Sequence, residues 1–296
     1  MKPTPFEYVI VDSLEAALSH KKEHGEDAKI LAGGQSLIPT MNYRLSQPSI
    51  LIDLNNIESL RYINKENGDL RIGAMTTQAK IEHSPIIAEA QPLIHETVPF
   101  IAHRQIRNRG TLGGSIAHAD PASELPLIAL ALKAKMHIQN SEAERWIDAE
   151  DFLITMFTVD LMPDEILTEI SFPEFPKNTG WSFMEVSRRK GDYAMAGVAA
   201  LVTLQDNGVC ESARLVYLNV GDKAIDAKKA AGLLAGELIT PASIEAAANT
   251  AIDEEIMPFG SVHAAPEYQG HLSRVLTERT LKTAHQRAEK LIRENN

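Results

Sequence analysis

Thr111-Leu112-Gly113-Gly114-Ser115 is a paired-glycine loop that indicates a site for an anion. Paired glycines can adopt positive φ and bring bare backbone N–H groups against a ligand, which a Cβ would obstruct. Consecutive N–H groups in such a loop form a concave anion site. The hydroxyls of Thr111 and Ser115 could donate further hydrogen bonds to phosphate. The loop then continues into an apolar helix, so it connects a candidate site to the core.

A second paired-glycine loop lies upstream, at Ala32-Gly33-Gly34-Gln35-Ser36, directly after the strand-like Lys29-Ile30-Leu31. Two such loops suit the two phosphates of a dinucleotide. A single Gly-Gly pair, however, is more often a tight turn between ordinary elements. Neither the Rossmann fingerprint nor a P-loop lysine is present, so a different phosphate cradle is required.

Composition and charge narrow the class of protein. The chain has 296 residues, a length that allows one large domain or two ordinary ones. Its hydrophobic content of 44% and charged content of 23% are typical of a soluble globular protein. The net charge of −11 argues against a nucleic-acid binder and against adhesion to anionic membranes. No secretory peptide and no membrane-spanning apolar run are visible, so we expect a cytoplasmic protein.

Cys210 is the only cysteine, which limits the redox chemistry that this chain can carry out by itself. One cysteine cannot form an internal disulfide, and it cannot hold an iron–sulfur cluster, which needs several thiolates. If the protein takes part in metal-based redox chemistry, another chain must therefore carry the metal.

The first 55 residues have a β-α-β pattern, with the first glycine loop where a strand passes into a helix. Asp12 and Glu15 form a capping-box pattern at the start of the first helix, which should end near Gly25. Ser36 can cap a second, short helix. We expect strands at 6–11, 30–32 and 50–54, and helices from 14 to about 25 and from 37 to about 44.

A hairpin and two helices are predicted before the main glycine loop. Asn67-Gly68 is a turn dipeptide suited to positive φ, and it should join strands at 60–63 and 70–72. Helices are expected at 78–83 and 92–108, and Pro99 should break or restart the second.

Three arginines, Arg104, Arg107 and Arg109, lead up to the main loop. In an acidic chain they could bind phosphate. They could equally be favourable cations at a helix C-terminus that need no ligand. The sequence leaves both interpretations open.

Ser123 should cap a helix with Glu124 in its first turn, and the apolar run 127–132 predicts that this helix is buried. Pro173, Pro176 and Asn178-Thr179-Gly180 form the best candidate linker. Beyond it, three strands followed by three helices predict a small α+β domain. The expected strands before the linker are 135–139, 144–147 and 168–172. The three expected strands beyond it are 183–189, 194–205 and 209–220, and the three expected helices are 223–234, 241–254 and 271–293.

Five motifs in order resemble a known family. They are Ala32-Gly33-Gly34-Gln35-Ser36-Leu37, Gln105-Ile106-Arg107-Asn108, Thr111-Leu112-Gly113-Gly114, residues 121–126, and Arg188-Arg189-Lys190-Gly191-Asp192-Tyr193-Ala194. The chain resembles the medium, FAD-carrying subunit of molybdenum hydroxylases such as carbon monoxide dehydrogenase and xanthine dehydrogenase. The resemblance implies an α+β fold, with a two-part PCMH-type FAD-binding domain and a small C-terminal domain made of a three-stranded sheet plus helices. We expect domains at 1–177, with subdomains of about 1–55 and 56–177, and at 178–296.

The resemblance also implies which residues bind the cofactor. Both glycine loops would wrap the FAD pyrophosphate through backbone N–H groups, Leu167 would pack on the flavin, and Tyr193 would cover the isoalloxazine. No catalytic residue and no metal ligand are expected in this chain. The full expected set is Leu31, Ala32, Gly33, Gly34, Gln35, Ser36, Leu37, Thr111, Gly113, Gly114, Ser115, His118, Glu124, Leu167, Met184, Asp192 and Tyr193.

The sequence departs from the family pattern at four of these positions. Gln35 stands where histidine is frequent, and Ser115 where asparagine is. Glu124 is one methylene longer than the usual aspartate. Met184, or alternatively Glu185, falls where many relatives have a lysine near the flavin.

By resemblance, the chain is an electron-transfer flavoprotein subunit. FAD, held without a covalent bond, would receive electrons from iron–sulfur clusters on a partner chain and pass them to an external acceptor. The molybdenum cofactor and the 2Fe–2S clusters would lie only on a large and a small partner subunit, in a dimer of heterotrimers. The substrate and the acceptor, whether NAD, quinone or oxygen, stay open.

Two alternatives come from other classes of protein. A free-standing FAD-dependent oxidoreductase would need an acid or base near the flavin, for which His103, His118 and Asp192 are candidates. Each of them is more often an ordinary polar residue. A nucleotide-binding or scaffold protein without turnover would be colourless when purified.

Overall fold

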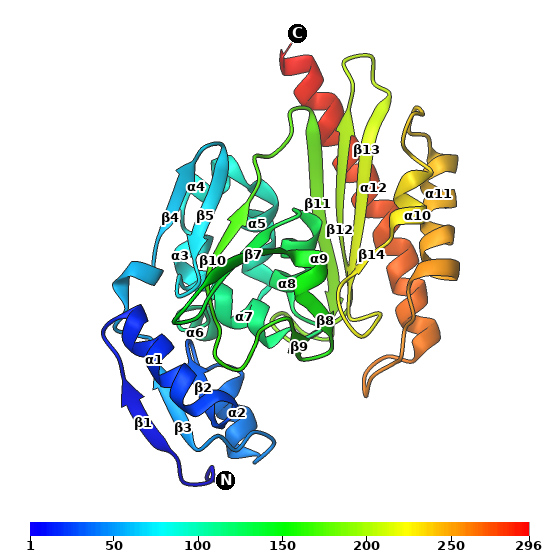
Figure 1. The fold of residues 1–296 in the computed structure, drawn as a ribbon. Coiled ribbons are helices and arrows are strands. Elements are labelled where there is room, and N and C mark those ends of the chain that lie inside the picture. The colour runs from blue at the N-terminus through cyan, green and yellow to red at the C-terminus, as the bar shows by residue number, and fades with distance from the viewer. Residues whose placement is uncertain (296) are drawn as a thin grey trace.

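Three larger β-sheets follow one another along the chain in the computed structural model, which describes residues 1–295 (Figure 1). The first is a three-stranded parallel sheet in the order β1-β3-β2. Its strands and helices are β1 (Glu7–Ile10), α1 (Leu14–His24), β2 (Ala28–Leu31), α2 (Leu37–Asn42) and β3 (Ile50–Asp53). β3 lies in the middle and is buried throughout, as its apolar sequence requires. The predicted β-α-β opening is therefore confirmed.

The predicted N-caps of α1 and α2, the two helices of this first part, differ from those in the structure. Ser13, not Asp12, caps α1, because its hydroxyl accepts from the N–H of Ala16 at 3.2 Å. Ser36 precedes α2 but makes no side-chain cap hydrogen bond. Gly25 ends α1 at φ +50°, as expected.

The second sheet is five-stranded and antiparallel, in the order β4-β5-β10-β6-β7. Its strands are β4 (Ile63–Glu66), β5 (Asp69–Gly73), β6 (Lys135–Gln139), β7 (Glu144–Asp148) and the central, fully buried β10 (Ile166–Phe172). A two-stranded hairpin, β8 (Leu153–Thr155) and β9 (Thr158–Val159), lies beside it in the chain. The first hairpin strand begins later than predicted, since Leu60 belongs to a 3-10 turn, Glu58–Leu60.

Short helices connect the strands of this second part. They are α3 (Gln78–Glu82), α4 (Pro85–Ala90), α5 (Pro92–Thr97), α6 (Arg104–Arg107), α7 (Leu112–His118), α8 (Glu124–Ala131) and α9 (Ala149–Phe152). The predicted helix 92–108 is broken, and Pro99 lies in the 3-10 turn Val98–Phe100 that separates α5 from α6. All eight residues of α8 are buried, which confirms the expectation from its unbroken apolar run.

The third sheet has the order β11-β12-β13-β14 and carries three helices (Figure 1). These elements are β11 (Thr179–Ser187), β12 (Ala194–Leu204), β13 (Cys210–Leu218), β14 (Ile225–Asp226), α10 (Lys228–Gly232), α11 (Pro241–Thr250) and α12 (Pro266–Asn295). The sheet has four strands rather than the expected three, because β14 forms where a helix was predicted. The long helix α12 packs across β11 so closely that a Cβ on Gly180 would lie 1.8 Å from the carbonyl oxygen of Ala284.

The largest hydrophobic core spans the predicted linker. It joins Phe172 of β10 and Leu127 of α8 to Phe183 and Leu218 of the third sheet. The other face of that sheet forms a separate core with α10 to α12. The third sheet is thus covered by α8 on one face and by α12 on the other. None of the helices in the described part of the chain is long and apolar enough to cross a membrane.

Candidate functional site: two glycine loops and a carboxyl pair

The two glycine loops lie side by side although about eighty residues separate them. A Cβ on Gly33 would come within 2.2 Å of the carbonyl oxygen of Arg109, just before the main loop. A Cβ on Gly114 would lie 3.5 Å from the Cβ of Ala32. Asn55, which follows β3, fixes the first loop by donating from Nδ2 to the carbonyl oxygen of Ala32 at 3.0 Å. Glycine at position 33 is therefore required for the close approach of the loops.

The first loop presents unused hydrogen-bond donors. Among the described residues, the N–H groups of Gly33, Gly34, Gln35 and Ser36 donate to no acceptor. Gly34 has φ +71°, which places its N–H and those of its neighbours on a curved turn. The side chain of Gln35 closes the turn by donating to the carbonyl oxygen of Gly33 at 3.2 Å. Unpaired backbone donors at this density are the structural signature of an anion cradle.

The second loop is built differently from the prediction. Its N–H groups are already engaged: Leu112 donates to the carbonyl of Thr76 at 3.0 Å, and Gly113 to that of Ala74 at 2.9 Å. Gly114 donates to the hydroxyl of Thr111 at 3.1 Å, so this threonine caps α7. The expectation that backbone N–H groups of both loops wrap a pyrophosphate therefore needs correction. The second loop offers hydroxyls, and its glycines serve close packing.

The packing role of Gly113 is direct, because a Cβ there would lie 2.5 Å from the Cβ of Ala74. Ser115, on the first turns of α7, has its hydroxyl 3.0 Å from that of Ser123. Ser123 consequently makes no cap hydrogen bond to α8, contrary to the prediction. A line of polar groups thus runs from the glycine loops to the start of α8.

Glu124 ends this line as the first residue of α8, and only 8% of it is exposed. Burial raises the pKa of Glu124 to about 7, and the negative charge of Asp120 adds to the shift. A second, half-buried carboxyl, Glu185, lies on β11. Burial raises the pKa of Glu185 to about 8, and the charge of Glu124 contributes. The Oε2 atom of Glu185 is enclosed and has no hydrogen-bond partner among the described residues.

Met184 and Glu185 point to opposite faces of β11, as successive strand residues must. Met184 packs against the core shared with α12, whereas Phe183, on the other face, belongs to the core shared with α8. Met184 therefore points away from the face that α8 covers, whereas Glu185, the alternative, lies on that face. The role of either residue in binding the cofactor stays a prediction. Tyr193, just before β12, is 73% exposed, and the charges of Asp120 and Glu124 act on its hydroxyl.

The surroundings of the remaining predicted residues say less about cofactor binding. Leu31 and Leu37 flank the first loop, and Leu167 is buried in the core to which the apolar residues of α8 also belong. His118 is half-buried, its ring lies 5.0 Å from that of Phe157, and burial lowers its pKa. Asp192 is exposed in the turn before Tyr193.

Arg107 is structural rather than a phosphate ligand. Its guanidinium forms a two-pronged pair with Glu82 at 2.8 and 2.9 Å and donates to the carbonyl of Ile101 at 2.8 Å. Only 9% of Arg107 is exposed, so these partners use it fully. The interpretation that needs no ligand holds for this arginine.

Asn55 and Glu82 support the site, and sequence reasoning did not single them out. One feature of the sequence could have indicated Asn55, because it is a polar residue that directly follows a buried strand. No feature of the sequence could have indicated Glu82, because its partner Arg107 is 25 residues away.

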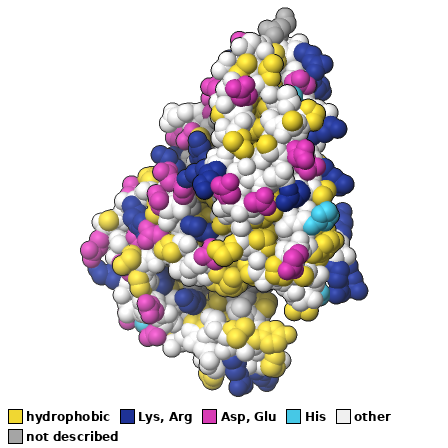
Figure 2. Space-filling view, turned by 90° about the vertical axis from the view of Figure 1, so that its right-hand side faces the viewer, with side chains coloured by type: hydrophobic (Ala, Val, Ile, Leu, Met, Phe, Trp, Pro, Cys, Tyr) yellow, Lys and Arg dark blue, Asp and Glu magenta, His cyan; other side chains and the backbone are white. Residues whose placement is uncertain are grey.

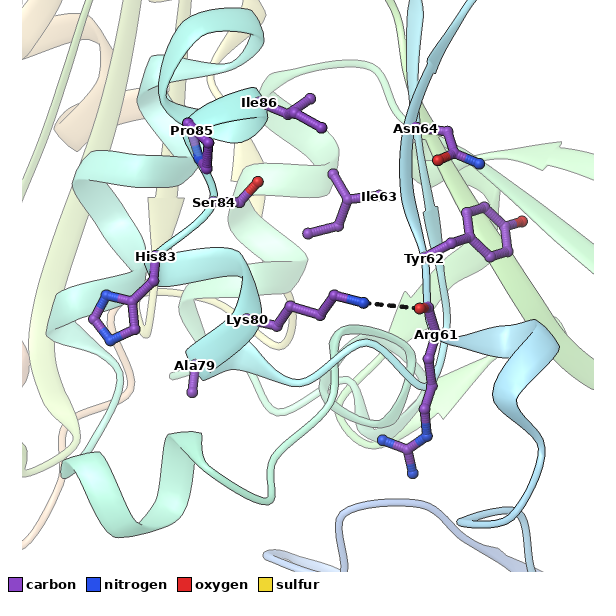
Figure 3. Close-up of a pocket in the computed structure, with 10 residues that line it drawn as sticks. All are labelled: Arg61, Tyr62, Ile63, Asn64, Ala79, Lys80, His83, Ser84, Pro85 and Ile86. Atoms are coloured by element: carbon purple, nitrogen blue, oxygen red, sulfur yellow. Dashed lines mark hydrogen bonds between the residues drawn. The ribbon is translucent and has the colours of Figure 1, made fainter.

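A groove of about 680 Å³ lies elsewhere, between β4 and the helices α3 and α4 (Figure 3). Lys80 crosses it to donate to the carbonyl oxygen of Arg61 at 2.9 Å. None of the predicted site residues lines this groove, so it is distinct from the glycine loops. Its lining residues are Arg61, Tyr62, Ile63, Asn64, Ala79, Lys80, His83, Ser84, Pro85 and Ile86.

Comparisons with known proteins agree with this geometry. Residues 4–175 match the family model described as "FAD binding domain in molybdopterin dehydrogenase", and residues 181–284 match "CO dehydrogenase flavoprotein C-terminal domain". The chain is 42% identical to the 6-hydroxypseudooxynicotine dehydrogenase complex subunit alpha of Paenarthrobacter nicotinovorans, over 97% of each chain.

Two solved structures have nearly the same fold. One is a carbon monoxide dehydrogenase from Hydrogenophaga pseudoflava, with a TM-score of 0.93 and 35% identity over 97% of this chain and 99% of the other. The other is quinoline 2-oxidoreductase from Pseudomonas putida 86, with a TM-score of 0.92, 35% identity and the same coverage. The predicted fold class and resemblance are confirmed. The chain belongs to the family of FAD-binding domains in molybdopterin dehydrogenases, joined to a flavoprotein C-terminal domain of the carbon monoxide dehydrogenase type.

Proposed function

We propose that this chain is the FAD-carrying electron-transfer subunit of a molybdenum-containing hydroxylase or dehydrogenase. It takes electrons from iron–sulfur clusters on a partner chain and passes them to an external acceptor. The observation that carries the proposal is the run of four unpaired N–H groups at residues 33–36, packed against the second glycine loop. Bound FAD supplies a two-electron carrier that can collect electrons singly.

The residues present fit this cofactor. The unpaired donors of the first loop suit a diphosphate, and the hydroxyls of Thr111 and Ser115 stand beside them. The exposed ring of Tyr193 suits stacking on an aromatic ring system. Cys210, the one thiol of the chain, is buried within the C-terminal core, and burial raises its pKa to about 11. It is therefore no ligand for a cluster, and the metals belong to other chains.

We further propose that a large molybdopterin subunit and a small iron–sulfur subunit bind this chain in a dimer of heterotrimers. One relative is named as subunit alpha of a dehydrogenase complex, and another as the medium chain of a carbon monoxide dehydrogenase. This chain also exposes apolar side chains that a partner would cover. These exposed residues are Ile154, Phe157, Met257 and Phe259. Figure 2 shows hydrophobic side chains gathered above the lowest lobe, at about the height of β8 and β9 in Figure 1.

Three further expectations from the sequence stay proposals. The FAD is held without a covalent bond, so acid precipitation should release it into the supernatant. The domains divide at 1–177, with subdomains of about 1–55 and 56–177, and 178–296. The complex is cytoplasmic.

The test is to purify the native protein with whatever accompanies it, and to measure flavin, molybdenum and iron. We expect a yellow chain, with molybdenum and iron only on co-purifying partners, and no turnover of a donor by the separated chain. A protein devoid of flavin would overturn the proposal. A flavin-containing chain that oxidises a donor alone would instead support the free-standing oxidoreductase.

A further inference from the structure

The last turns of α1 bring two histidines and a glutamate together on one face of the helix. His20, Glu23 and His24 have the spacing i, i+3 and i+4, which makes side chains neighbours on a helix surface. One ligand atom of each lies within 4.8 Å of those of the other two. Nε2 of His24 lies 3.7 Å from Oε2 of Glu23, and the two imidazole rings are stacked with 6.1 Å between their centres. In residues 1–295, no other three side chains with metal-binding atoms approach one another so closely.

The His20 ring has no structural contact that would account for its polar atoms. Its Nδ1 atom is enclosed, and no hydrogen-bond partner for it exists in the described part of the chain. A buried polar atom without a partner calls for an explanation, and an ion bound at the same place is one. The stacked ring of His24, whose charged neighbour is Glu23, lies beside it. The chain thus leaves both imidazoles available as ligands.

Two lysines lie between these residues in the sequence, but contacts hold their ammonium groups elsewhere. Lys21 is buried and donates to two backbone carbonyl oxygens, at 2.8 and 3.0 Å. Lys22 pairs with Glu142 at 2.7 Å. The helix ends at His24, and the partial negative charge at the C-terminus of a helix favours a cation. The local charges are therefore compatible with a bound cation.

The three side chains also select the class of ion. Two imidazole nitrogens and one carboxylate oxygen suit zinc and neighbouring transition metals, whereas calcium and magnesium prefer oxygen ligands throughout. Ligands about 2.0–2.2 Å from a tetrahedral zinc ion lie about 3.4 Å from one another, and the 3.7 Å between His24 and Glu23 is close to this. The side chain of Glu23 is 68% exposed, so water can reach a fourth position.

We propose that His20, Glu23 and His24 bind a divalent transition-metal ion, with Zn²⁺ as the expected ion, at the C-terminal end of α1. The sequence predicted no metal ligand in this chain, and this site is separate from the molybdenum and iron that the proposed function places on partner chains. All three ligands come from one helix, so the site needs no second chain. Because the unfolded chain does not hold the three side chains together, the ion stabilises the folded form.

The test titrates Zn²⁺ into the full chain, first freed of metal with a chelator, and measures binding by calorimetry at about pH 8, where free imidazole is neutral. We expect saturable binding of one ion per chain. His20→Ala and His24→Ala should each weaken it at least about tenfold, because losing even a residue that only supports a ligand weakens metal binding about 10- to 100-fold. His271→Ala is the matched control. It removes an exposed histidine from helix α12 and should leave the affinity unchanged.

X-ray absorption by the zinc-loaded, unsubstituted chain provides a second readout that does not depend on how a variant folds. We expect nitrogen and oxygen ligands at about 2.0–2.2 Å, with the outer scattering of two imidazole rings. Binding that does not saturate, no imidazole scattering, or an unchanged affinity in a folded chain with both His20→Ala and His24→Ala would mean adventitious ions only and would overturn the site. Each of these outcomes leaves the proposed function standing, because the site shares no residue with the glycine loops.

Discussion

Gly34 is the single residue on which the proposed phosphate cradle depends most. Its φ of +71° is strained for any other residue, and a Cβ would lie 3.2 Å from the side chains of Leu31 and Ile38. We expect Gly34→Ala to cost about 1 kcal/mol and to turn the neighbouring N–H groups away. FAD binding, followed by quenching of flavin fluorescence, should weaken about tenfold or more, since tenfold corresponds to about 1.4 kcal/mol.

Gly232→Ala is the matched control for this change. Gly232 ends α10 with no heavy atom near its Cβ position, so alanine there should leave FAD binding unchanged. If Gly34→Ala bound FAD as tightly as the control, the cradle would lie elsewhere.

At the scale of single residues, the sequence singled out the two glycine loops but not the contacts that each of their residues makes. The glycine pairs were visible because glycine alone tolerates the geometry. The sequence could not show that the N–H groups of Leu112 and Gly113 are taken by Thr76 and Ala74, since that contact forms only in the folded chain. Strand alternation separates Met184 from Glu185, but which of the two faces α8 is decided by the packing of the sheet.

At the scale of elements, Arg107 and Glu82 join α6 to α3 just before the main glycine loop. Arg107→Met would leave the largely buried carboxylate of Glu82 without its partner, at a cost of roughly 3 kcal/mol in the free energy of unfolding. Denaturation by urea measures this cost. Arg104→Met, on the exposed side of α6, should change stability by no more than about 0.5 kcal/mol.

The same pair predicts a pH dependence with a definite sign. Hydrogen bonding to Arg107 lowers the pKa of Glu82 below its ordinary value of 4.5. Its contribution is therefore complete above pH 4.5 and is lost as the pH falls through the lowered value. The stability difference between Arg107→Met and the unsubstituted chain should accordingly shrink below pH 4.5. A difference that stayed constant into acid would mean that the ion pair is not its cause.

Most helices and strands could be predicted from the sequence, but their exact ends and the shortest strands could not. The β-α-β opening and the strand at 135–139 were clear because their apolar patterns and turn residues agree. The two-residue strand β14 was missed because it pairs with β13, a contact that local sequence does not record. Helix α12 begins at Pro266, five residues before the predicted start, since proline is tolerated in a first helical turn.

At the scale of the whole molecule, the parts before and after the linker share one core. Beyond the apolar contacts, Glu96 of α5 accepts from the backbone N–H of Phe183 at 3.0 Å and pairs with Arg287 of α12 at 2.6 Å. Phe100 meets Phe183 edge to face at 5.3 Å between ring centres. The sequence predicted the linker from its prolines, but it gave no sign that the core continues across it.

This shared core predicts that the full chain unfolds in one calorimetric transition rather than two. Glu96→Gln removes the charge from a partly exposed ion pair and weakens the bond to Phe183, so we expect a loss of about 1–2 kcal/mol and a lower melting temperature with the single transition retained. Glu289→Gln, which removes an exposed i,i+4 pair with Arg293 on α12, should shift the melting temperature far less. Two resolved transitions in the unsubstituted chain would show that the regions before and after the linker fold independently, because a core that truly spans the linker must be disrupted on both sides at once.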